Sequence, residues 1–251
     1  MRVRVGTSGY NYPEWKGSFY PADLKPARFL PYYAEHFSTV EINASFYRMP
    51  TPKTVRGWAD AVPDGFTFVL KAPQRITHFA RLRDVDEPVR AFCDVTRMLR
   101  GKLGPLFFQL PPNFKKDVSR LGDLLVLLPP DLRAAFEFRH ESWFADDVYE
   151  RLRGRNAALC IADTEEGATP AVATADWGYL RLRAVEYADE DLARWAATIR
   201  SVGAGWRDAF AFFKHEDRGT GPALGKRFET LFDRFGARPG PPQSGLSSPP
   251  R

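Results

Sequence analysis

AAFEFRHESWFADDVYERLRGRNAALCIA, residues 134–162, contains one complete strand–helix–strand unit. Its first and last segments, Ala134–Phe138 and Ala158–Ala162, are short and mostly apolar, as strands that are covered on both faces should be. Between them, Asp146–Arg153 has the spacing of an amphipathic helix. This order predicts two parallel strands that are joined by a crossover helix.

The same unit recurs on both sides of this stretch. Eight candidate strands are found in the sequence: Arg2–Gly6, Thr39–Ile42, Phe66–Lys71, Leu106–Gln109, Ala134–Phe138, Ala158–Ala162, Gly178–Arg181 and Ala209–Phe213. Helical patterns fall between them: Arg28–Phe37, Thr51–Ala61, Asp84–Leu103, Asp117–Leu128, Asp146–Arg153, Asp189–Val202 and Thr220–Phe235. Only Thr164–Thr174 shows little helical character. Eight such units in 251 residues predict an α/β fold, a single-domain eight-stranded β/α barrel of the TIM type.

The barrel domain is predicted to span residues 1–235. The last segment, 236–251, is rich in Pro, Gly and Ser and is predicted to be disordered. Met1–Val5 enters strand-like alternation directly, and the sequence has no run of 18 apolar residues. Cys93 and Cys160 lie in apolar surroundings and are interpreted as buried free thiols. We therefore expect a cytoplasmic protein without membrane contact.

Composition indicates the charge of a partner. The formal net charge is +5 and the isoelectric point is about 9.2, which favours an anionic ligand. No Lys/Arg block is long enough to resemble a nucleic-acid-binding arm. Aromatic residues make up 14% of the chain, and most Phe residues lie inside apolar runs, so they are predicted to build the core.

Polar residues stand at the carboxyl ends of the strands, where barrels of this type carry their active sites. Glu41 and Asn43 alternate with apolar neighbours and are predicted to face the barrel axis. A carboxylate there is costly unless it is paired or functional. Lys71 ends strand three, where it binds an anion, forms a Schiff base or pairs with Glu41. Glu137 and Arg139 share one side of strand five.

Further candidates lie in the loops that follow the strands. The turn Gly6–Tyr10 has two glycines and two hydroxyls, and its backbone amides are candidate anion donors. The Gly-rich turn Arg218–Gly221, which enters a helix, is a candidate phosphate site. The predicted catalytic residues are Glu41, Lys71, Glu137 and His140. The predicted substrate-binding residues are Thr7, Ser8, Tyr10, Asn43, Phe46, Tyr47, His78, Gln109, Arg139, Trp143, Asp163, Arg181 and Lys214.

Five motifs, in order along the chain, resemble those of the YecE-like family, the domain of unknown function numbered 72. They are Gly6–Tyr10 with Trp15 and Phe19–Pro21, Val40–Tyr47, Lys71–Pro73 with Ile76–His78, Phe108–Pro112, and Glu137–Trp143. The resemblance runs from Gly6 to Phe232 and implies a β/α barrel without a settled activity. This chain departs from the family pattern in two places. Arg181-Leu182-Arg183-Ala184 stands where the family commonly has Arg-Phe-His-Gly, and Lys214–Asp217 replaces an Asn-rich segment.

Three functions fit these residues. The first is an enzyme, a hydrolase, lyase or isomerase, that acts on an anionic or phosphorylated small molecule. Its anion would be held by cationic side chains: Lys71, Arg139, Arg181 and Lys214. Glu41 and Glu137 would act as acid and base, assisted by His78 or His140. Two carboxylates also suit glycoside hydrolysis, in which their separation decides the stereochemistry.

The other two functions use the same face differently. A nucleic-acid binder or nuclease would use its aromatic residues for stacking: Tyr10, Tyr12, Trp15, Phe46, Tyr47 and Trp143. A non-catalytic barrel would bind a metabolite or protein partner. No cofactor is predicted. A divalent metal on Glu41, Glu137, Asp163 and His140 is an alternative that the neighbouring cations disfavour. The sequence leaves the oligomeric state open, and it predicts that Glu137→Gln abolishes binding or turnover without unfolding the protein.

Overall fold

The computed structural model describes residues 1–233, so the predicted 236–251 segment lies outside the described residues. Eight parallel strands, each near its predicted position, form the centre of the molecule. They are β1 (Arg2–Thr7), β2 (Thr39–Ile42), β3 (Thr67–Lys71), β4 (Leu103–Gln109), β5 (Ala134–Glu137), β6 (Ala158–Thr164), β8 (Trp177–Leu182) and β9 (Asp208–Phe213). Apolar residues on both faces of these strands explain why each is covered on both sides.

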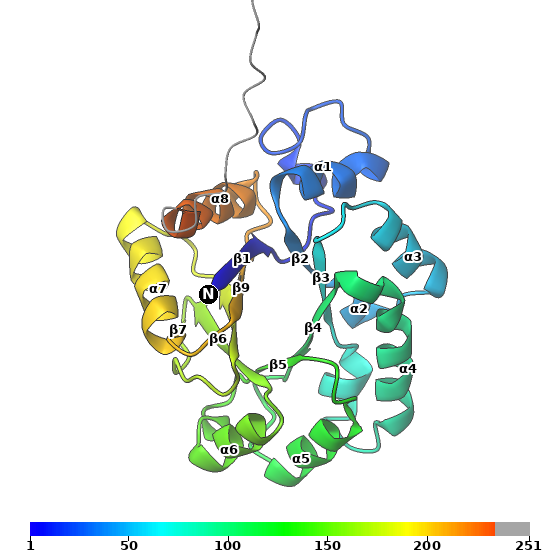
Figure 1. Ribbon diagram of the computed structural model, residues 1–251, viewed down its shortest axis with the longest axis vertical. Coiled ribbons are helices and arrows are strands. Elements are labelled where there is room, and N and C mark those ends of the chain that lie inside the picture. Colours follow the sequence, from blue (N-terminus) through cyan, green and yellow to red (C-terminus); the bar gives the residue numbers. More distant parts are fainter. Residues whose placement is uncertain (234–251) are drawn as a thin grey trace, which may run out of the picture.

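The strands follow the order β1-β9-β8-β6-β5-β4-β3-β2. The two end strands then meet at their carboxyl ends, where Ser8 pairs with Glu41 in a parallel bridge and the Gly9 amide donates to the Glu41 carbonyl at 2.8 Å. The sheet is therefore closed into a barrel, as predicted. Figure 1 shows the strands at the centre of a ring of helices.

Eight α-helices are described in residues 1–233, and most of them connect one strand to the next. They are α1 (Phe29–His36), α2 (Ala44–Tyr47), α3 (Pro52–Asp60), α4 (Asp86–Thr96), α5 (Val118–Leu127), α6 (Asp146–Gly154), α7 (Asp189–Val202) and α8 (Thr220–Asp233). Thr51 caps α3 by accepting from the Thr54 amide at 3.2 Å, and Pro52 is its first residue. Short helical turns complete the connections: η1 (Pro13–Trp15), η2 (Pro26–Arg28), η3 (Arg75–Phe79), η4 (Arg97–Lys102) and η5 (Glu141–Trp143).

Two connections differ from the sequence prediction. The helix predicted over Asp84–Leu103 is divided, because Arg100 has a φ of 53° and a ψ of −128° inside η4. Between β6 and β8 no helix forms. The chain instead turns back as β7 (Gly167–Ala168), antiparallel to the end of β6, with Gly167 at a φ of 112°. We call residues 164–170 the flap.

The core is divided by the barrel wall. Two clusters lie between strands and helices, one around Phe68, Phe108 and Phe136 and the other around Leu180 and Phe213. A third fills the barrel interior with inward-facing residues of alternate positions: Val69, Phe107, Ala135, Ala158, Cys160, Ala162, Trp177, Tyr179, Phe210 and Phe212. Cys93 and Cys160 are both buried and unpaired with each other, as predicted.

Among residues 1–233, no helix is both long enough and apolar enough to cross a bilayer. This agrees with the hydropathy of the sequence.

Candidate active site

A layer of polar side chains closes the barrel interior at the carboxyl ends of the strands. Alternation along each strand turns five of them inward, above the aromatic interior: Glu41 of β2, Lys71 of β3, Gln109 of β4, Glu137 of β5 and Arg181 of β8. Each is at most 8% exposed. Buried charges of this kind must be paired to be tolerated, so their partners define what the layer can do.

Arg181 joins the two carboxylates. Its Nη2 donates to Glu41 Oε1 at 2.9 Å and its Nη1 donates to Glu137 Oε2 at 2.7 Å. The guanidinium also lies over the Phe107 ring, 4.8 Å from its centroid. Both outer nitrogens therefore serve the protein itself. We revise its predicted role from substrate anion binding to holding Glu41 and Glu137 in place.

Glu41 has two further partners. Ser8 Oγ donates to Oε1 at 2.8 Å, and the Tyr179 hydroxyl donates to Oε2 at 2.5 Å. Burial, followed by the negative charge of Glu41, raises the pKa of Tyr179 well above its usual value, so this hydroxyl stays a donor. The predicted inward direction of Glu41 is thus observed. Asn43 is half-buried and caps α2 without a side-chain hydrogen bond.

Of the two carboxylates in this layer, Glu137 forms more ion pairs than Glu41. Besides Arg181, Gln109 Nε2 donates to Oε1 at 2.6 Å and Arg139 Nε donates to it at 3.0 Å. Arg183 Nη1 lies 3.8 Å away as an ion pair. Burial alone would raise the pKa of Glu137, but the three arginines outweigh it and hold the pKa well below its usual range. Glu137 is therefore an acceptor at neutral pH and does not supply a proton.

Lys71 pairs with an amide rather than with Glu41. Its Nζ donates to Gln109 Oε1 at 2.7 Å and lies 4.0 Å from the centroid of the Phe46 ring. Burial, followed by the nearby charge of Arg181, lowers the pKa of Lys71 to about 7, although Glu41 and Glu137 oppose this. An amine with this pKa is partly neutral at pH 7, so Lys71 is a candidate base or nucleophile.

A pocket of about 770 Å³ opens above Glu137. Its walls are the ends of β5, β6, β8 and β9 together with the flap. Three cationic side chains line it: Arg139 is 32% exposed, Arg183 is 20% exposed and Lys214 is 41% exposed. The exposed carboxylates of Glu165 and Glu166 on the flap also line it. Burial, followed by Arg181, lowers the pKa of Lys214, and burial also lowers that of Arg183.

An aromatic rim lies beside Lys71. The rings of Phe46 and His78 meet edge to face at 4.9 Å, and Tyr47 is 74% exposed next to them. Burial, followed by the charge of Lys71, lowers the pKa of His78 to about 4, so its imidazole is neutral. Its Nδ1 lies 2.9 Å from Thr77 Oγ1. Phe46 therefore covers the amine, and the rings of Tyr47 and His78 pack against Phe46.

The loop after β1 does not offer its amides to a ligand. The amides of Thr7, Ser8 and Gly9 donate to the Tyr33 hydroxyl, the Phe213 carbonyl and the Glu41 carbonyl respectively. Thr7 Oγ1 is likewise bonded to the Tyr33 hydroxyl at 2.9 Å. The Tyr10 carbonyl accepts from the Tyr20 hydroxyl. We therefore assign Thr7 and Tyr10 to the support of the barrel and keep only Ser8 in the polar layer.

Three predicted residues lie outside the layer. Asp163 lies on the same side of β6 as Ile161, which faces the helices. Its Oδ2 accepts from the Tyr187 hydroxyl and from Trp195 Nε1, both at 2.9 Å. His140 Nδ1 accepts from the Ser142 amide at 3.2 Å and caps η5. Trp143 is fully buried and stacks on Phe138 at 4.7 Å. We remove all three from the candidate site.

These positions also bear on the alternatives. Within the described residues, no group of three or more His, Cys, Asp or Glu side chains is placed to hold a metal ion, and the four ligands considered for one do not converge. Glycoside hydrolysis needs one carboxylic acid that donates a proton, and the lowered pKa of Glu137 does not suit that residue to this role. Of the six aromatic residues considered for stacking, Trp15 and Trp143 are buried in the core and are not accessible to a base.

Sequence reasoning missed Tyr179 as a partner of Glu41 and named Arg183 only as a departure from the family pattern. The signal for both is the alternation Trp177, Tyr179, Arg181, Arg183 along and just beyond β8. Residues of one parity on a barrel strand point to the same side, so the inward direction of Arg181 places Tyr179 directly below it.

The closed ring of eight parallel strands and its charged carboxyl-terminal layer define a β/α barrel with a polar site at the end where such barrels carry theirs. The family described as Protein of unknown function DUF72 matches residues 4–245. The chain therefore belongs to the DUF72 family, as its motifs predicted.

Known proteins and structures agree with this assignment. The chain is 30% identical over 154 residues to the UPF0759 protein YecE of Escherichia coli strain K12, a match that covers 61% of this chain and about half, 54%, of that relative. It is 25% identical to the UPF0759 protein YunF of Bacillus subtilis strain 168, over 92% of this chain and 95% of that one. A DUF72 family protein from Thermotoga maritima superimposes with a TM-score of 0.80 at 25% identity, over 93% of this chain and 100% of the other. One from Enterococcus faecalis V583, at 18% identity, has the same fold with a TM-score of 0.75, over 92% of this chain and 98% of the other.

Proposed function

We propose that the chain is an enzyme that binds a small anionic substrate in the pocket above Glu137 and uses the Lys71 amine as its base or nucleophile. The observation that supports this best is the charge of the site. Three arginines stand in or on the polar layer, Arg139, Arg181 and Arg183, against two carboxylates, Glu41 and Glu137, and Lys71 adds a partly protonated amine. An anionic group in the pocket would neutralise the excess.

Arg139 and Arg183 are the proposed anion-binding residues. Arg139 uses only its Nε for Glu137, and Arg183 approaches Glu137 without a hydrogen bond. Arg183 Nε is buried and has no hydrogen-bond partner in the described part of the chain. An unpaired buried donor is costly, so a ligand oxyanion that accepts from it would bind with a gain. The planar guanidinium suits a carboxylate or phosphate in a bidentate pair.

Lys71 is the proposed reacting group. Its neutral amine can abstract a proton next to a carbonyl group, or attack the carbonyl carbon and form an imine when the carbonyl oxygen leaves as water. Gln109 orients the amine by accepting from it, and the Phe46 ring excludes water on one side. Both reactions are typical of lyases and isomerases, and we therefore favour these classes over a hydrolase. Glu41, Gln109 and Glu137 are positioning residues in this scheme.

The test is a thermal-shift screen against anionic metabolites with and without a carbonyl group. A ligand at about 100 times its Kd stabilises the protein by roughly 2.7 kcal/mol. Arg183→Gln should remove the shift, whereas Arg90→Gln, which deletes an exposed arginine of α4, should keep it. Borohydride added with a carbonyl ligand should then label Lys71 through a reduced imine.

Each outcome has a meaning. A shift that Arg183→Gln does not weaken would contradict the assignment of the pocket. A shift without any Lys71-dependent turnover or labelling would leave a metabolite-binding barrel instead of an enzyme. Retention of the protein on oligonucleotides, lost as salt increases, would favour the nucleic-acid alternative over a small substrate.

A further inference from the structure

We propose a second anion-binding site at the opposite mouth of the barrel, the amino-terminal one, where Arg4 and Arg100 hold a free phosphate or the phosphate group of a monoester. This site is independent of the function proposed above. It lies at the other end of the strands and shares no residue with the pocket above Glu137.

A cavity of about 580 Å³ opens at this mouth. Arg4 of β1, Arg133 before β5 and Asp208 of β9 line it at the amino-terminal ends of their strands. Phe210, two residues after Asp208 on β9, also lines the cavity and belongs to the aromatic barrel interior. The η4 turn contributes Arg97 and Arg100 to the rim. The cavity is therefore built from strand ends on one side and a single turn on the other.

The charges that line this cavity do not balance. Four arginines, Arg4, Arg97, Arg100 and Arg133, face two aspartates, Asp131 and Asp208. Both aspartates are already paired in specific geometry. Arg97 Nη2 donates to Asp131 Oδ1 at 2.6 Å, and Arg133 Nη1 contacts both oxygens of Asp208 at 2.9 and 3.0 Å. The pairs leave two positive charges on the cavity wall.

Those two charges belong to Arg4 and Arg100. Among the residues that the structure describes, the Arg4 side chain makes one hydrogen bond, from Nη1 to the Gly65 carbonyl at 3.5 Å, which is at the long end of the range for such bonds. Within residues 1–233, the Arg100 side chain has neither an ion pair nor a hydrogen bond. Two guanidinium groups with unused donors on one cavity are the arrangement that binds a phosphate dianion.

The pKa of Arg4 also indicates an excess of positive charge at this mouth. Burial, followed by the like charge of Arg2, lowers the pKa of Arg4, and Arg133 adds to this while Asp208 opposes it. The mouth is thus a region where positive charge is crowded and only partly compensated. A bound dianion relieves that repulsion, which adds to the gain from its hydrogen bonds.

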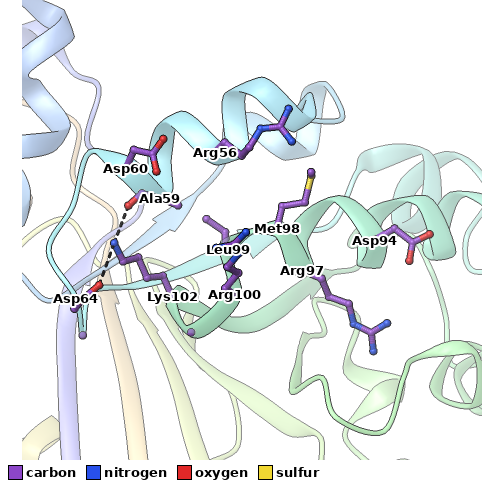
Figure 2. A pocket seen from close by; sticks show the side chains of 12 residues that line it. Arg56, Ala59, Asp60, Asp64, Asp94, Arg97, Met98, Leu99, Arg100 and Lys102 are labelled. Atoms are coloured by element: carbon purple, nitrogen blue, oxygen red, sulfur yellow. Dashed lines mark hydrogen bonds and ion pairs between the residues drawn. The ribbon is translucent and has the colours of Figure 1, made fainter.

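A neighbouring cavity shows that the excess is specific to this mouth. Figure 2 shows that cavity, of about 770 Å³, between α3 and η4. Its charged lining is nearly balanced, with Arg56, Arg97, Arg100 and Lys102 against Asp60, Asp64 and Asp94. Lys102 is also occupied there, because its Nζ donates to the carbonyls of Ala59 and Val62, both at 2.8 Å. Arg97 and Arg100 line both cavities. Arg97 is paired with Asp131, whereas no carboxylate among the described residues pairs with Arg100.

The backbone at Arg100 is strained as well. A φ of 53° with a ψ of −128° is a conformation that glycine adopts readily and that a side chain with a Cβ does not. Strain of this kind is often found where a ligand is held. An arginine retained at such a position is consistent with a role for its side chain.

The test uses isothermal titration calorimetry of the full chain, at low ionic strength, with inorganic phosphate and with glycerol phosphate. Arg100→Gly removes the guanidinium and suits the backbone, so it should fold at least as well as the original and lose about tenfold or more in affinity. Arg4→Gln should lose a similar factor. Arg56→Gln, which removes the same charge from the neighbouring cavity only, should bind as the original does.

The two anion sites are separated by a further variant. Arg183→Gln should abolish only binding in the pocket above Glu137 and leave the Arg100-dependent binding intact. Equal binding of both ligands would identify the phosphate group itself as sufficient, and binding of the monoester alone would identify a phosphorylated metabolite. Unchanged affinity in both Arg100→Gly and Arg4→Gln would overturn the proposal, as would phosphate binding that only Arg183→Gln removes.

Discussion

At the scale of single residues, the buried part of the site depends on Arg181 and its two carboxylates. The sequence predicted that Glu137→Gln would leave the fold intact. The observed contacts change that expectation, since the variant leaves Arg181, 1% exposed, with Glu41 as its remaining carboxylate. Removal of one partner of a buried ion pair is strongly destabilising. We expect Glu137→Gln to lower the free energy of unfolding by about 3 kcal/mol at pH 7 in urea titrations.

This loss depends on pH in a defined direction. The folded-state pKa of Glu137 is depressed, so its contribution is complete above the pKa of a free Glu, about 4.3, and is lost as the pH falls toward the folded-state value. The difference between the original protein and Glu137→Gln should therefore shrink below about pH 4. Glu165→Gln on the exposed flap is the control and should show neither effect. A constant difference from pH 7 to pH 3 would contradict the pairing.

Lys71 gives a dependence in the same direction over a higher pH range, but here the charged side chain destabilises the folded protein. Its folded pKa of about 7 lies below that of a free lysine, about 10.4, so the unfolded chain binds the extra proton between these values and stability rises with pH across them. Lys71→Met removes the burial of a charge and should stabilise the protein at pH 6 by roughly 2 kcal/mol while abolishing turnover. The gain should fade toward pH 10. Lys115→Met, at an exposed position, should leave the slope unchanged.

Residue parity explains how far the sequence could predict the site. Glu41, Lys71, Gln109, Glu137 and Arg181 were all found from strand ends and alternation, and the structure brings them together. Asp163 was misplaced although its parity with Ile161 already indicated the outer face. The pairing of Lys71 with Gln109 instead of Glu41 could not be predicted, because it depends on the stagger between neighbouring strands.

At the scale of elements, the strands were predicted to within a few residues because short apolar runs between turns are a strong signal. The break after α4 was not predicted, since Arg97–Leu103 continues a helical spacing while the backbone turns at Arg100. The flap could not be foreseen either, although the absence of a helix there was. A two-residue strand such as β7 has no pattern of its own and exists because β6 continues far enough to pair with it.

The anchoring of α7 supplies an element-scale prediction. Asp163 at the end of β6 accepts two hydrogen bonds, from Tyr187 before α7 and from Trp195 within it. Asp163→Ala leaves both donors without their acceptor and should lower the free energy of unfolding by about 2 kcal/mol, with anion binding unchanged. Loss of binding without loss of stability would return Asp163 to the site. Glu150→Ala, at an exposed position of α6, is the matched control for removal of a carboxylate.

At the scale of the whole molecule, the barrel consists of two four-stranded halves. Strands β2 to β5 form one and β1, β9, β8 and β6 form the other. The halves meet through two residue pairs between β5 and β6 and through the Ser8–Glu41 bridge between β1 and β2. The second junction is also part of the polar layer, because Ser8 Oγ donates to the Glu41 carboxylate. Closure of the barrel and assembly of the candidate active site are therefore one event.

Gly6 tests this coupling, because β1 passes β2 too closely for any side chain. A Cβ at Gly6 would lie well inside van der Waals contact with the Thr39 carbonyl oxygen, a backbone atom that cannot move aside without opening the junction. We expect Gly6→Ala to lower the free energy of unfolding by about 3 kcal/mol. The same variant should weaken anion binding above Glu137, although it touches no ligand. Gly57→Ala, in α3 with open space around it, should instead gain up to about 1 kcal/mol and bind normally. If Gly6→Ala lost stability but bound anions with full affinity, the site would be assembled without the β1–β2 junction, and the two halves of the barrel would be independent of each other in function.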